Sequence, residues 1–473
     1  MRETFLHFPK RDTLKSFYMS DVYPALICGI VLIGNFTNLE VYFNTVIVFL
    51  TIGALLICDS IRPFIISLCT SYMQISVKNS PFYPSRSDYL FSGWRFPFLI
   101  VMCVMIFMGI FAFVIRNKIY RRISFRNTPF LLSVTVLSLS FVLNGIFSSG
   151  FSVSGFLYGL ENAVVYSLLL LLMYHGFSSE EDSSELMRYF SYISALIAIV
   201  ISAELLHLFI TSDTVFVDGA INKTALALGW GIWNLIGVSL AVLIPPIFYG
   251  MQVGKYPWFY FAVATVAYVM SILTMSRNAL IFSTLIYLTC VIISCFKGNY
   301  KRVFRIITGV GVVAFILGVM IFWDKISALF FDYIERGFSD NGRFEIWSAA
   351  IDNFLSAPVF GNGFYGLKVE NFYSFGPVPL MAHNTVLQLL SSMGAFGLIA
   401  YGFYAFSVFK PAFIKPTLLK TMLALSMAVL MAQSMLDNFV FNLYPMFYYS
   451  AAVAIMLKSD EQSDLQNGMK SIK

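Results

Sequence analysis

Arg277 is a charged side chain placed where an uncharged one would be expected. It interrupts an apolar run of about 40 residues, roughly twice the length that one membrane span needs. The simplest interpretation is a turn between two helices, with the guanidinium reaching to water. The alternative is that the side chain faces inward and binds an anion, because arginine makes bidentate contacts with phosphate and charged groups at a membrane edge tend to be functional.

Arg343 is a second candidate, in a polar stretch of the chain. It follows Gly342, which we expect to mark the start of a helix. In that helix Trp347, four residues further on, would share a face with Arg343. A solvated arginine beside Glu345 is the plain interpretation, and a functional cation is the alternative.

A turn-rich strip follows, with Pro358, Gly361 and Gly363. Glycines without side chains could let backbone N–H groups approach an anion. Glycine and proline also simply end helices. The strip therefore adds a possible anion contact, without deciding between these two roles.

His383 and Asn384 open the next apolar run, and Gln388 lies four residues beyond Asn384. A histidine at a helix N-terminus feels the positive end of the dipole, which favours the neutral imidazole. Such an imidazole can act as a base or as a hydrogen-bond partner of a hydroxyl. The alternative is a histidine that merely lies at the membrane interface.

These residues must be positioned by membrane helices, because the composition is that of a membrane protein. Of 473 residues, 58% are hydrophobic and 12% are charged, whereas a soluble domain carries about 25% charged residues. We therefore predict an all-α, polytopic transmembrane bundle in one integral membrane domain, residues 1–473. The best estimate is about 14 spans, within a range of about 12 to 14. The predicted spans cover about 22–37, 41–58, 63–77, 96–115, 130–147, 157–174, 189–210, 226–250, 256–275, 278–296, 306–323, 384–409, 417–436 and 439–457.

The basic residues orient this bundle, since cytoplasmic links carry an excess of lysine and arginine. The amino terminus and the link at 116–126 are the clearest basic segments, and an even number of predicted spans separates them. Both termini are therefore expected in the cytoplasm, including a polar tail at 458–473. The net charge of +6 lies in short links between spans, which argues against nucleic acid as a partner.

The link between Trp323 and His383 is the longest, and this orientation puts it outside as a periplasmic loop, residues 324–383. Its many aromatic residues indicate that it is partly helical and folds against the membrane domain. Loops of this length are usually functional or disordered. No external acidic cluster has metal-ligand spacing, although Asp332, Glu335 and Asp340 are close in sequence.

The six cysteines lie in apolar stretches and form no CxxC pair near a histidine, so we expect small buried hydrophobic side chains rather than disulfides or metal ligands. The first apolar run begins near Val22 and lacks a cleavage site with small residues. A cleaved signal peptide is therefore not expected.

The order of the candidate residues resembles that of the O-antigen ligase and O-antigen polymerase superfamily, a group of integral-membrane, GT-C-type glycosyltransferases. The pattern covers about residues 265–400. It consists of Ser276-Arg277-Asn278-Ala279-Leu280, Gly342-Arg343 with Trp347, Pro358 with Gly361 and Gly363, and His383-Asn384 with Gln388 and Gly394.

The resemblance implies transfer of a glycan from undecaprenyl diphosphate on the periplasmic face, with inversion and with no metal or other cofactor. Arg277 and Arg343 would hold the diphosphate and His383 would act near the acceptor hydroxyl, with Glu345 as a rival base. Because the leaving diphosphate gains charge, preplaced guanidinium groups favour the transition state. The further substrate-binding residues expected on this basis are Trp347, Asn384, Gln388, Gly361 and Gly363.

Two functions within this superfamily and one outside it remain open. A polymerase, which joins repeat units on the lipid carrier, is slightly favoured over a ligase, which moves finished polysaccharide to lipid A-core. A flippase for lipid-linked oligosaccharides is the third, since Glu161 and Glu204 fall in apolar segments. The expected partners are the lipid-linked donor, a glycan or lipid A-core acceptor and membrane lipids, with room for a chain-length regulator. The expected location is the bacterial inner membrane.

Overall fold

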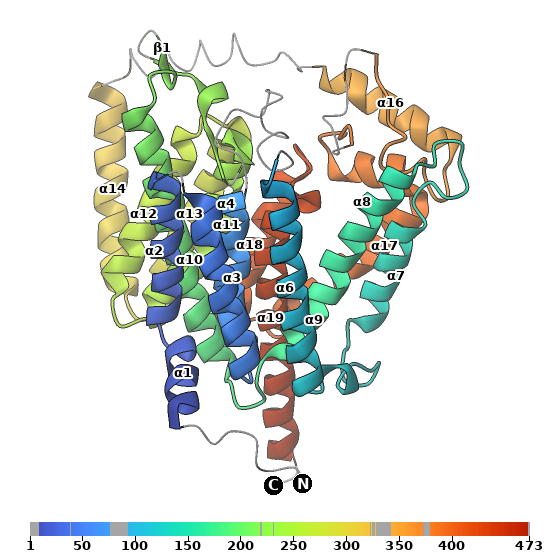
Figure 1. Cartoon of the computed structure of the whole chain (residues 1–473). Coiled ribbons are helices and arrows are strands. Elements are labelled where there is room, and N and C mark those ends of the chain that lie inside the picture. Colours follow the sequence, from blue (N-terminus) through green and yellow to red (C-terminus); the bar gives the residue numbers. More distant parts are fainter. Residues whose placement is uncertain are drawn as a thin grey trace.

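The computed structural model describes residues 9–37, 39–75, 93–217, 220–229, 231–321, 323, 327, 342–370, 372 and 379–471. Most of these residues are helical, and the helices stand side by side as a bundle (Figure 1). In order, the α-helices are α1 (Pro9–Met19), α2 (Val22–Thr37), α3 (Glu40–Ile57), α4 (Arg62–Ile75), α6 (Arg95–Arg116), α7 (Leu131–Val142), α8 (Val153–Ala163), α9 (Leu170–Gly176), α10 (Ser183–Thr211), α11 (Trp233–Val253), α12 (Pro257–Leu273), α13 (Arg277–Phe296), α14 (Lys301–Ile321), α16 (Arg343–Ser356), α17 (Thr385–Ile414), α18 (Leu418–Gln433) and α19 (Leu443–Ser471).

Short elements connect them. A π-helical turn, Val164–Leu169, joins α8 to α9. Two small antiparallel hairpins lie between α10 and α11, separated by the 3-10 turn Lys223–Ala225. Their strands are β1 (Phe216–Val217), β2 (Ala220–Ile221), β3 (Ala227–Leu228) and β4 (Gly231–Ile232). Further 3-10 turns are Ile119–Arg121 and Phe439–Phe441.

Seven described helices are long and apolar enough to cross a membrane, and α1 with α2, bent by 66°, would make eight if the pair is one span. Three shorter apolar helices, α7, α12 and α18, accompany them. A multi-pass, all-α membrane protein is thus confirmed, whereas the count of 12 to 14 spans is not confirmed and stays a prediction. The seven are Glu40–Ile57, Arg95–Arg116, Val153–Gly176, Ser183–Thr211, Trp233–Val253, Arg277–Phe296 and Thr385–Ile414.

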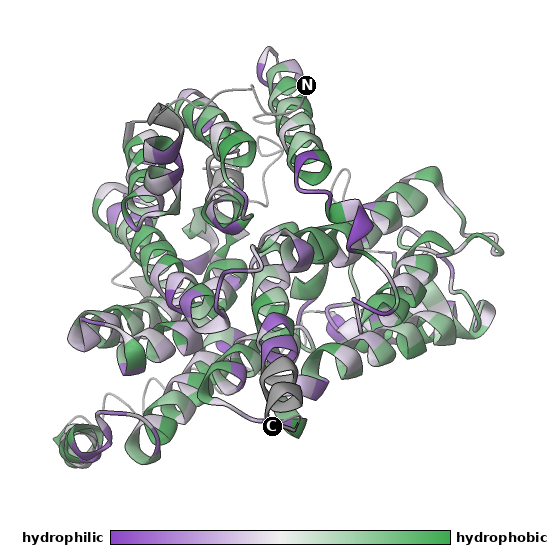
Figure 2. Cartoon of the chain, turned by 90° about the horizontal axis from the view of Figure 1, so that it is seen from below, coloured by the Kyte–Doolittle hydropathy of each residue, from purple (hydrophilic) through white to green (hydrophobic). Residues whose placement is uncertain are grey.

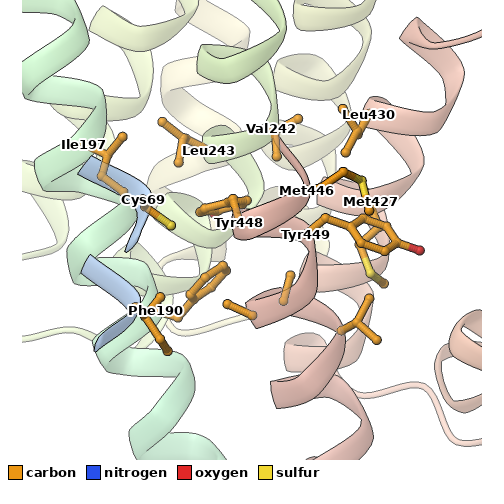
Figure 3. Close-up of a cluster of buried hydrophobic side chains, with 14 of the residues drawn as sticks. Cys69, Phe190, Ile197, Val242, Leu243, Met427, Leu430, Met446, Tyr448 and Tyr449 are labelled. Carbon is orange, nitrogen blue, oxygen red and sulfur yellow. The ribbon is translucent and has the colours of Figure 1, made fainter. Parts of the chain in front are cut away.

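The helix α11 forms the centre of the bundle, because 94% of its most apolar window is buried inside the protein, against 17% for α6. Figure 3 shows part of the surrounding core, in which Val242 of α11 lies near Leu430 of α18 and Leu243 lies on the side of Ile197 of α10. By contrast, α6 turns large hydrophobic side chains outward, as a lipid-facing helix does. Hydrophobic residues also cover much of the other helices when the bundle is seen from below (Figure 2).

Small residues allow α11 and α13 to approach closely. A Cβ added at Gly237 would lie 2.4 Å from the Cβ of Ala279, so only glycine fits there. The hydroxyl of Ser271 donates to the carbonyl of Gly237 at 3.1 Å. Close packing of small residues is a usual means of helix association in membranes, and here it fixes the start of α13 against α11.

The two ends of the bundle differ (Figure 1). The helix α1 and the C-terminal end of α19 lie at the lower end, while α16 and the hairpin strand β1 lie at the upper end. Residues 458–471, expected as a polar tail, continue α19 as helix.

The described part of the long external link folds against the bundle, as its apolar content predicts. Five buried residues of α16 and the following segment form a small core of their own: Ile346, Ala350, Leu367, Leu380 and Ala382. Phe364 is fully buried, with its ring 5.0 Å from that of Tyr158 and 5.6 Å from that of Phe441. The link is therefore anchored both to itself and to the helices below.

Candidate active site

His383 meets a carboxylate that is distant in the sequence. Its Nδ1 lies 2.9 Å from Oδ1 of Asp437, which follows the end of α18. An ionised carboxylate can only accept, so Nδ1 carries the proton and Nε2 is left as the acceptor. The backbone of His383 has a φ of 50°, a region that side-chain-bearing residues seldom adopt, which shows that the surrounding structure holds this residue in place.

Asp437 stays charged because its neighbours favour the ionised form. Burial by itself would raise the pKa of Asp437, but the hydrogen bond and charge of His383, the N–H of Asn438 and the charge of Arg343 together hold the pKa below its usual value. The Asn438 N–H donates at 3.0 Å, and Nδ2 of Asn234 on α11 lies 3.3 Å from Oδ2. The result is a carboxylate that can orient the imidazole and stabilise its protonated form.

The helix α17 begins directly after His383, and its first turn is fixed by several hydrogen bonds. Asn384 caps the helix by accepting from the N–H of Leu387 at 3.1 Å. Thr385 donates to the carbonyl of Ser434 from both its N–H, at 3.1 Å, and its hydroxyl, at 2.7 Å. These bonds tie the start of α17 to the end of α18.

Gln388 and Trp347 hold the backbone next to His383. The side-chain oxygen of Gln388, which is fully buried, accepts from the N–H of Ala382 at 2.7 Å and from Nδ2 of Asn438 at 3.2 Å. The indole N–H of Trp347 donates to the carbonyl of Ala382 at 2.9 Å. Both side chains lie beside His383, and these bonds give them a positioning role.

Arg343 is the first residue of α16, and Gly342, with a φ of 74°, precedes it as the helix cap. The predicted helix start is thus confirmed. Arg343 is half-buried, and its charge helps to lower the pKa of Asp437. Glu345, the rival base, is exposed on α16.

Arg277 opens α13 at a tight turn after α12, as the first interpretation of the sequence expects. The turn has Met275 at a φ of 56° and Ser276 as the cap, whose hydroxyl accepts from the N–H of Ala279 at 3.3 Å. The neighbouring Asn278 donates from Nδ2 to the carbonyl of Gln433 at 2.9 Å. Since Gln433 ends α18, the starts of α13 and α17 are both joined to the same helix end.

Gly361 and Gly363 lie elsewhere. Their N–H groups donate to the carbonyls of Ala357 and Ser392, both at 2.9 Å, and their φ angles are 67° and 81°. Ser392 is eight residues into α17 from Asn384, or about 12 Å of helix rise. The structure does not bring these glycines to His383, and their N–H groups are already used, that of Gly361 at the end of α16 and that of Gly363 against α17.

Three polar residues of the site were missed by the sequence reasoning: Asp437, Asn234 and Lys223. Lys223 lies between the hairpins, where burial and the charge of Arg277 lower its pKa. The predicted topology carried a usable signal for Asp437, because this residue ends an apolar run on the same side as His383. Nothing in the sequence singled out Asn234 or Lys223.

No group of three or more histidine, cysteine, aspartate or glutamate side chains among the described residues could hold a metal ion. Asp332, Glu335 and Asp340 lie outside the described residues. All six cysteines are free, and five of them are buried.

Comparison with known families matches residues 261–402 to a family model described as O-antigen ligase. The matched segment includes Arg277, Arg343 and His383 and the start of α17, while Asp437, Lys223 and Asn234 lie beyond it. No curated protein matches the chain.

Proposed function

From the match of residues 261–402 to the O-antigen ligase family, which supports the O-antigen ligase and polymerase superfamily, we propose that this protein transfers a lipid-linked glycan at the upper end of its bundle. The donor is a glycan on undecaprenyl diphosphate and the acceptor is a sugar hydroxyl. The upper end faces the periplasm, the membrane is the bacterial inner membrane, and both termini are cytoplasmic. The pairing of His383 Nδ1 with Oδ1 of Asp437 at 2.9 Å is the observation on which the proposal depends.

The proposed reaction assigns one task to each group. Nε2 of His383 takes the proton of the acceptor hydroxyl as its oxygen bonds to the anomeric carbon. The bond from that carbon to the diphosphate oxygen breaks, and the electron pair leaves with the diphosphate. Arg277 and Arg343 stabilise the charge that grows there, and Asp437 stabilises the imidazolium. Inversion follows from attack on the face opposite the leaving group.

Within this chemistry the acceptor defines the enzyme. We propose a polymerase, in which the acceptor is another lipid-linked glycan. A ligase acting on lipid A-core is the second candidate, and the description of the matched family favours it. The two differ in one assay, because a polymerase elongates lipid-linked units supplied alone, whereas a ligase needs lipid A-core.

The test uses purified protein in liposomes with lipid-linked oligosaccharide and either acceptor. Transfer is expected without ATP or an ion gradient. Arg277→Ala and Arg343→Ala should each lower the rate of transfer about 10- to 150-fold, because each charged hydrogen bond contributes about 1.5 to 3 kcal/mol. Arg305→Ala serves as the control, since Arg305 is exposed on α14 near its first turn, at the opposite end of the bundle.

Translocation of the lipid-linked oligosaccharide without any transfer would overturn the proposal. Wild-type rates of transfer in both Arg277→Ala and Arg343→Ala would also overturn it. The first of these results would support the flippase instead. Loss of transfer in Arg305→Ala would mean that the substitutions act through folding rather than through the site.

A further inference from the structure

Lys223 lies outside the matched segment, yet the fold brings it to Arg277. We propose that Lys223 and Arg277 together form the subsite for the diphosphate of the donor, on the α11 and α13 side of the histidine–aspartate pair. This inference rests on the proposed function and adds a specific cation to it.

The two hairpins between α10 and α11 fix the position of Lys223. Asn222 precedes it and caps its 3-10 turn, with its side-chain oxygen accepting from the N–H of Thr224 at 3.3 Å. The N–H of Asn222 donates to the carbonyl of Val215 at 2.8 Å, and its Nδ2 donates to the carbonyl of Thr214 at 3.3 Å. These hydrogen bonds hold the backbone next to Lys223 in place.

The side chain of Lys223 points to the start of α11. Its Nζ lies 5.9 Å from the ring centre of Trp233, within the range of a cation–π contact. Trp233 is 8% exposed, and the next residue, Asn234, contacts Asp437. Two adjacent residues of α11 therefore contact the two groups, Trp233 the lysine and Asn234 the carboxylate of Asp437.

The charges around Lys223 are unbalanced. The charge of Arg277 acts on Lys223, and no carboxylate of a described residue pairs with Lys223. Burial and the charge of the arginine both lower the pKa of Lys223. A bound diphosphate would supply an anion for this lysine.

In this proposal the diphosphate and the transferred proton go to different residues. The leaving group lies at Arg277 and Lys223, and the proton moves to His383 beside Asp437.

The test measures anion binding separately from transfer. Purified protein in nanodiscs is titrated with inorganic pyrophosphate and with undecaprenyl diphosphate, with sulfate as the reference anion. Lys223→Ala should weaken binding of both diphosphates about tenfold, the loss expected for one charged hydrogen bond, and Lys223→Arg should restore most of it. Lys255→Ala is a matched control, because Lys255 also stacks on an aromatic ring, that of Tyr256 at 5.3 Å, but at the far end of α11.

The outcomes separate this inference from the proposed function. Diphosphate binding that falls in Lys223→Ala while wild-type protein transfers no glycan would support the subsite and overturn the function. Transfer by the wild type, with unchanged affinity and KM in Lys223→Ala, would overturn the subsite and leave the function standing. Equal weakening in Lys223→Ala and Lys255→Ala, or no pyrophosphate binding by the wild type, would also overturn the subsite.

Discussion

Replacing Asp437 by asparagine tests the histidine–aspartate pair most directly. In the wild type His383 Nδ1 lies 2.9 Å from Oδ1 of Asp437. Asparagine keeps the shape of this side chain, and its carbonyl oxygen can still accept from Nδ1. The substitution removes the charge that stabilises the imidazolium formed when Nε2 takes the proton. Catalysis should therefore suffer more than folding or substrate binding.

The size of the loss follows from the geometry. The Asp437 side chain is 18% exposed, so solvent screens it only in part, and a hydrogen bond to a charged group contributes about 1.5 to 3 kcal/mol. At about 1.4 kcal/mol for each factor of ten, kcat should fall about 10- to 150-fold. KM should change less than about twofold, because Asp437 acts through His383 and does not touch the substrate. In His383→Ala, kcat should fall further, by a factor of about 10² to 10⁴.

The assay is the rate of glycan transfer in liposomes at saturating donor. Glu345→Gln is the matched control, since Glu345 is the exposed carboxylate two residues after Arg343, and it should retain wild-type kcat. The double variant of Asp437→Asn with His383→Ala should be no slower than His383→Ala alone, because the two residues act as one unit. Wild-type kcat in Asp437→Asn would show that the charge of Asp437 does not stabilise the imidazolium, and a large loss in Glu345→Gln would make Glu345 the base instead.

Three further outcomes are expected. Trp347→Phe keeps an aromatic ring but loses the hydrogen bond to the Ala382 carbonyl. Because that bond contributes about 0.5 to 1.5 kcal/mol, kcat should fall about two- to tenfold. An unchanged rate would show that Trp347 does not help to position His383. Gly361→Ala should prevent recovery of folded protein, because the φ of Gly361 is 67° and the added Cβ would lie 2.3 Å from a backbone carbon of α17. The control is Gly309→Ala, which has open space around it and should give a normal size-exclusion profile. The lowered pKa of Asp437 means that its ionised form stabilises the fold fully above about pH 4, the pKa of a free aspartate. The difference in thermal stability between wild type and Asp437→Asn should therefore be constant above about pH 4, shrink as the pH falls further, and vanish only below the lowered pKa.

Helix positions could be predicted wherever an apolar run has the length of a span and polar residues mark its ends. The run predicted at 96–115 is observed as Arg95–Arg116, and that at 278–296 as Arg277–Phe296. The run predicted from 226 fails in its first turns, because β3 and β4 pair there as a hairpin and α11 starts only at Trp233. Strands of two residues have no measurable period, and their apolar residues look the same in sequence as those of a helix.

The candidate site was predictable in Arg277, Arg343 and His383 and not in the residues that the fold brings to them. Arg277 and His383 could be recognised because each breaks the apolar pattern of its own segment. Asp437 is 54 residues from His383 and follows an ordinary apolar run, so its role arises only when α17 and α18 pack together. Gly361 was expected at the anion, yet its positive φ serves the contact with α17.

The chemistry gathers where several helices begin and one ends. Arg277 and Arg343 are the first residues of their helices, His383 lies directly before the cap of α17, and Asn234 is in the first turn of α11. Because N–H groups at a helix start lack partners and carry partial positive charge, converging starts favour a bound anion. The end of α18 presents the opposite feature, carbonyls without helical partners.

Those carbonyls hold the site together. The carbonyl of Gln433 accepts from Asn278, next to Arg277, and the carbonyl of Ser434 accepts from Thr385, two residues after His383. The arginine and the histidine are therefore positioned by adjacent residues at the end of one helix, and Asp437 follows three residues later. A shift of α18 along its axis would move Arg277, His383 and Asp437 together, which is why residues so far apart in the sequence can keep one geometry.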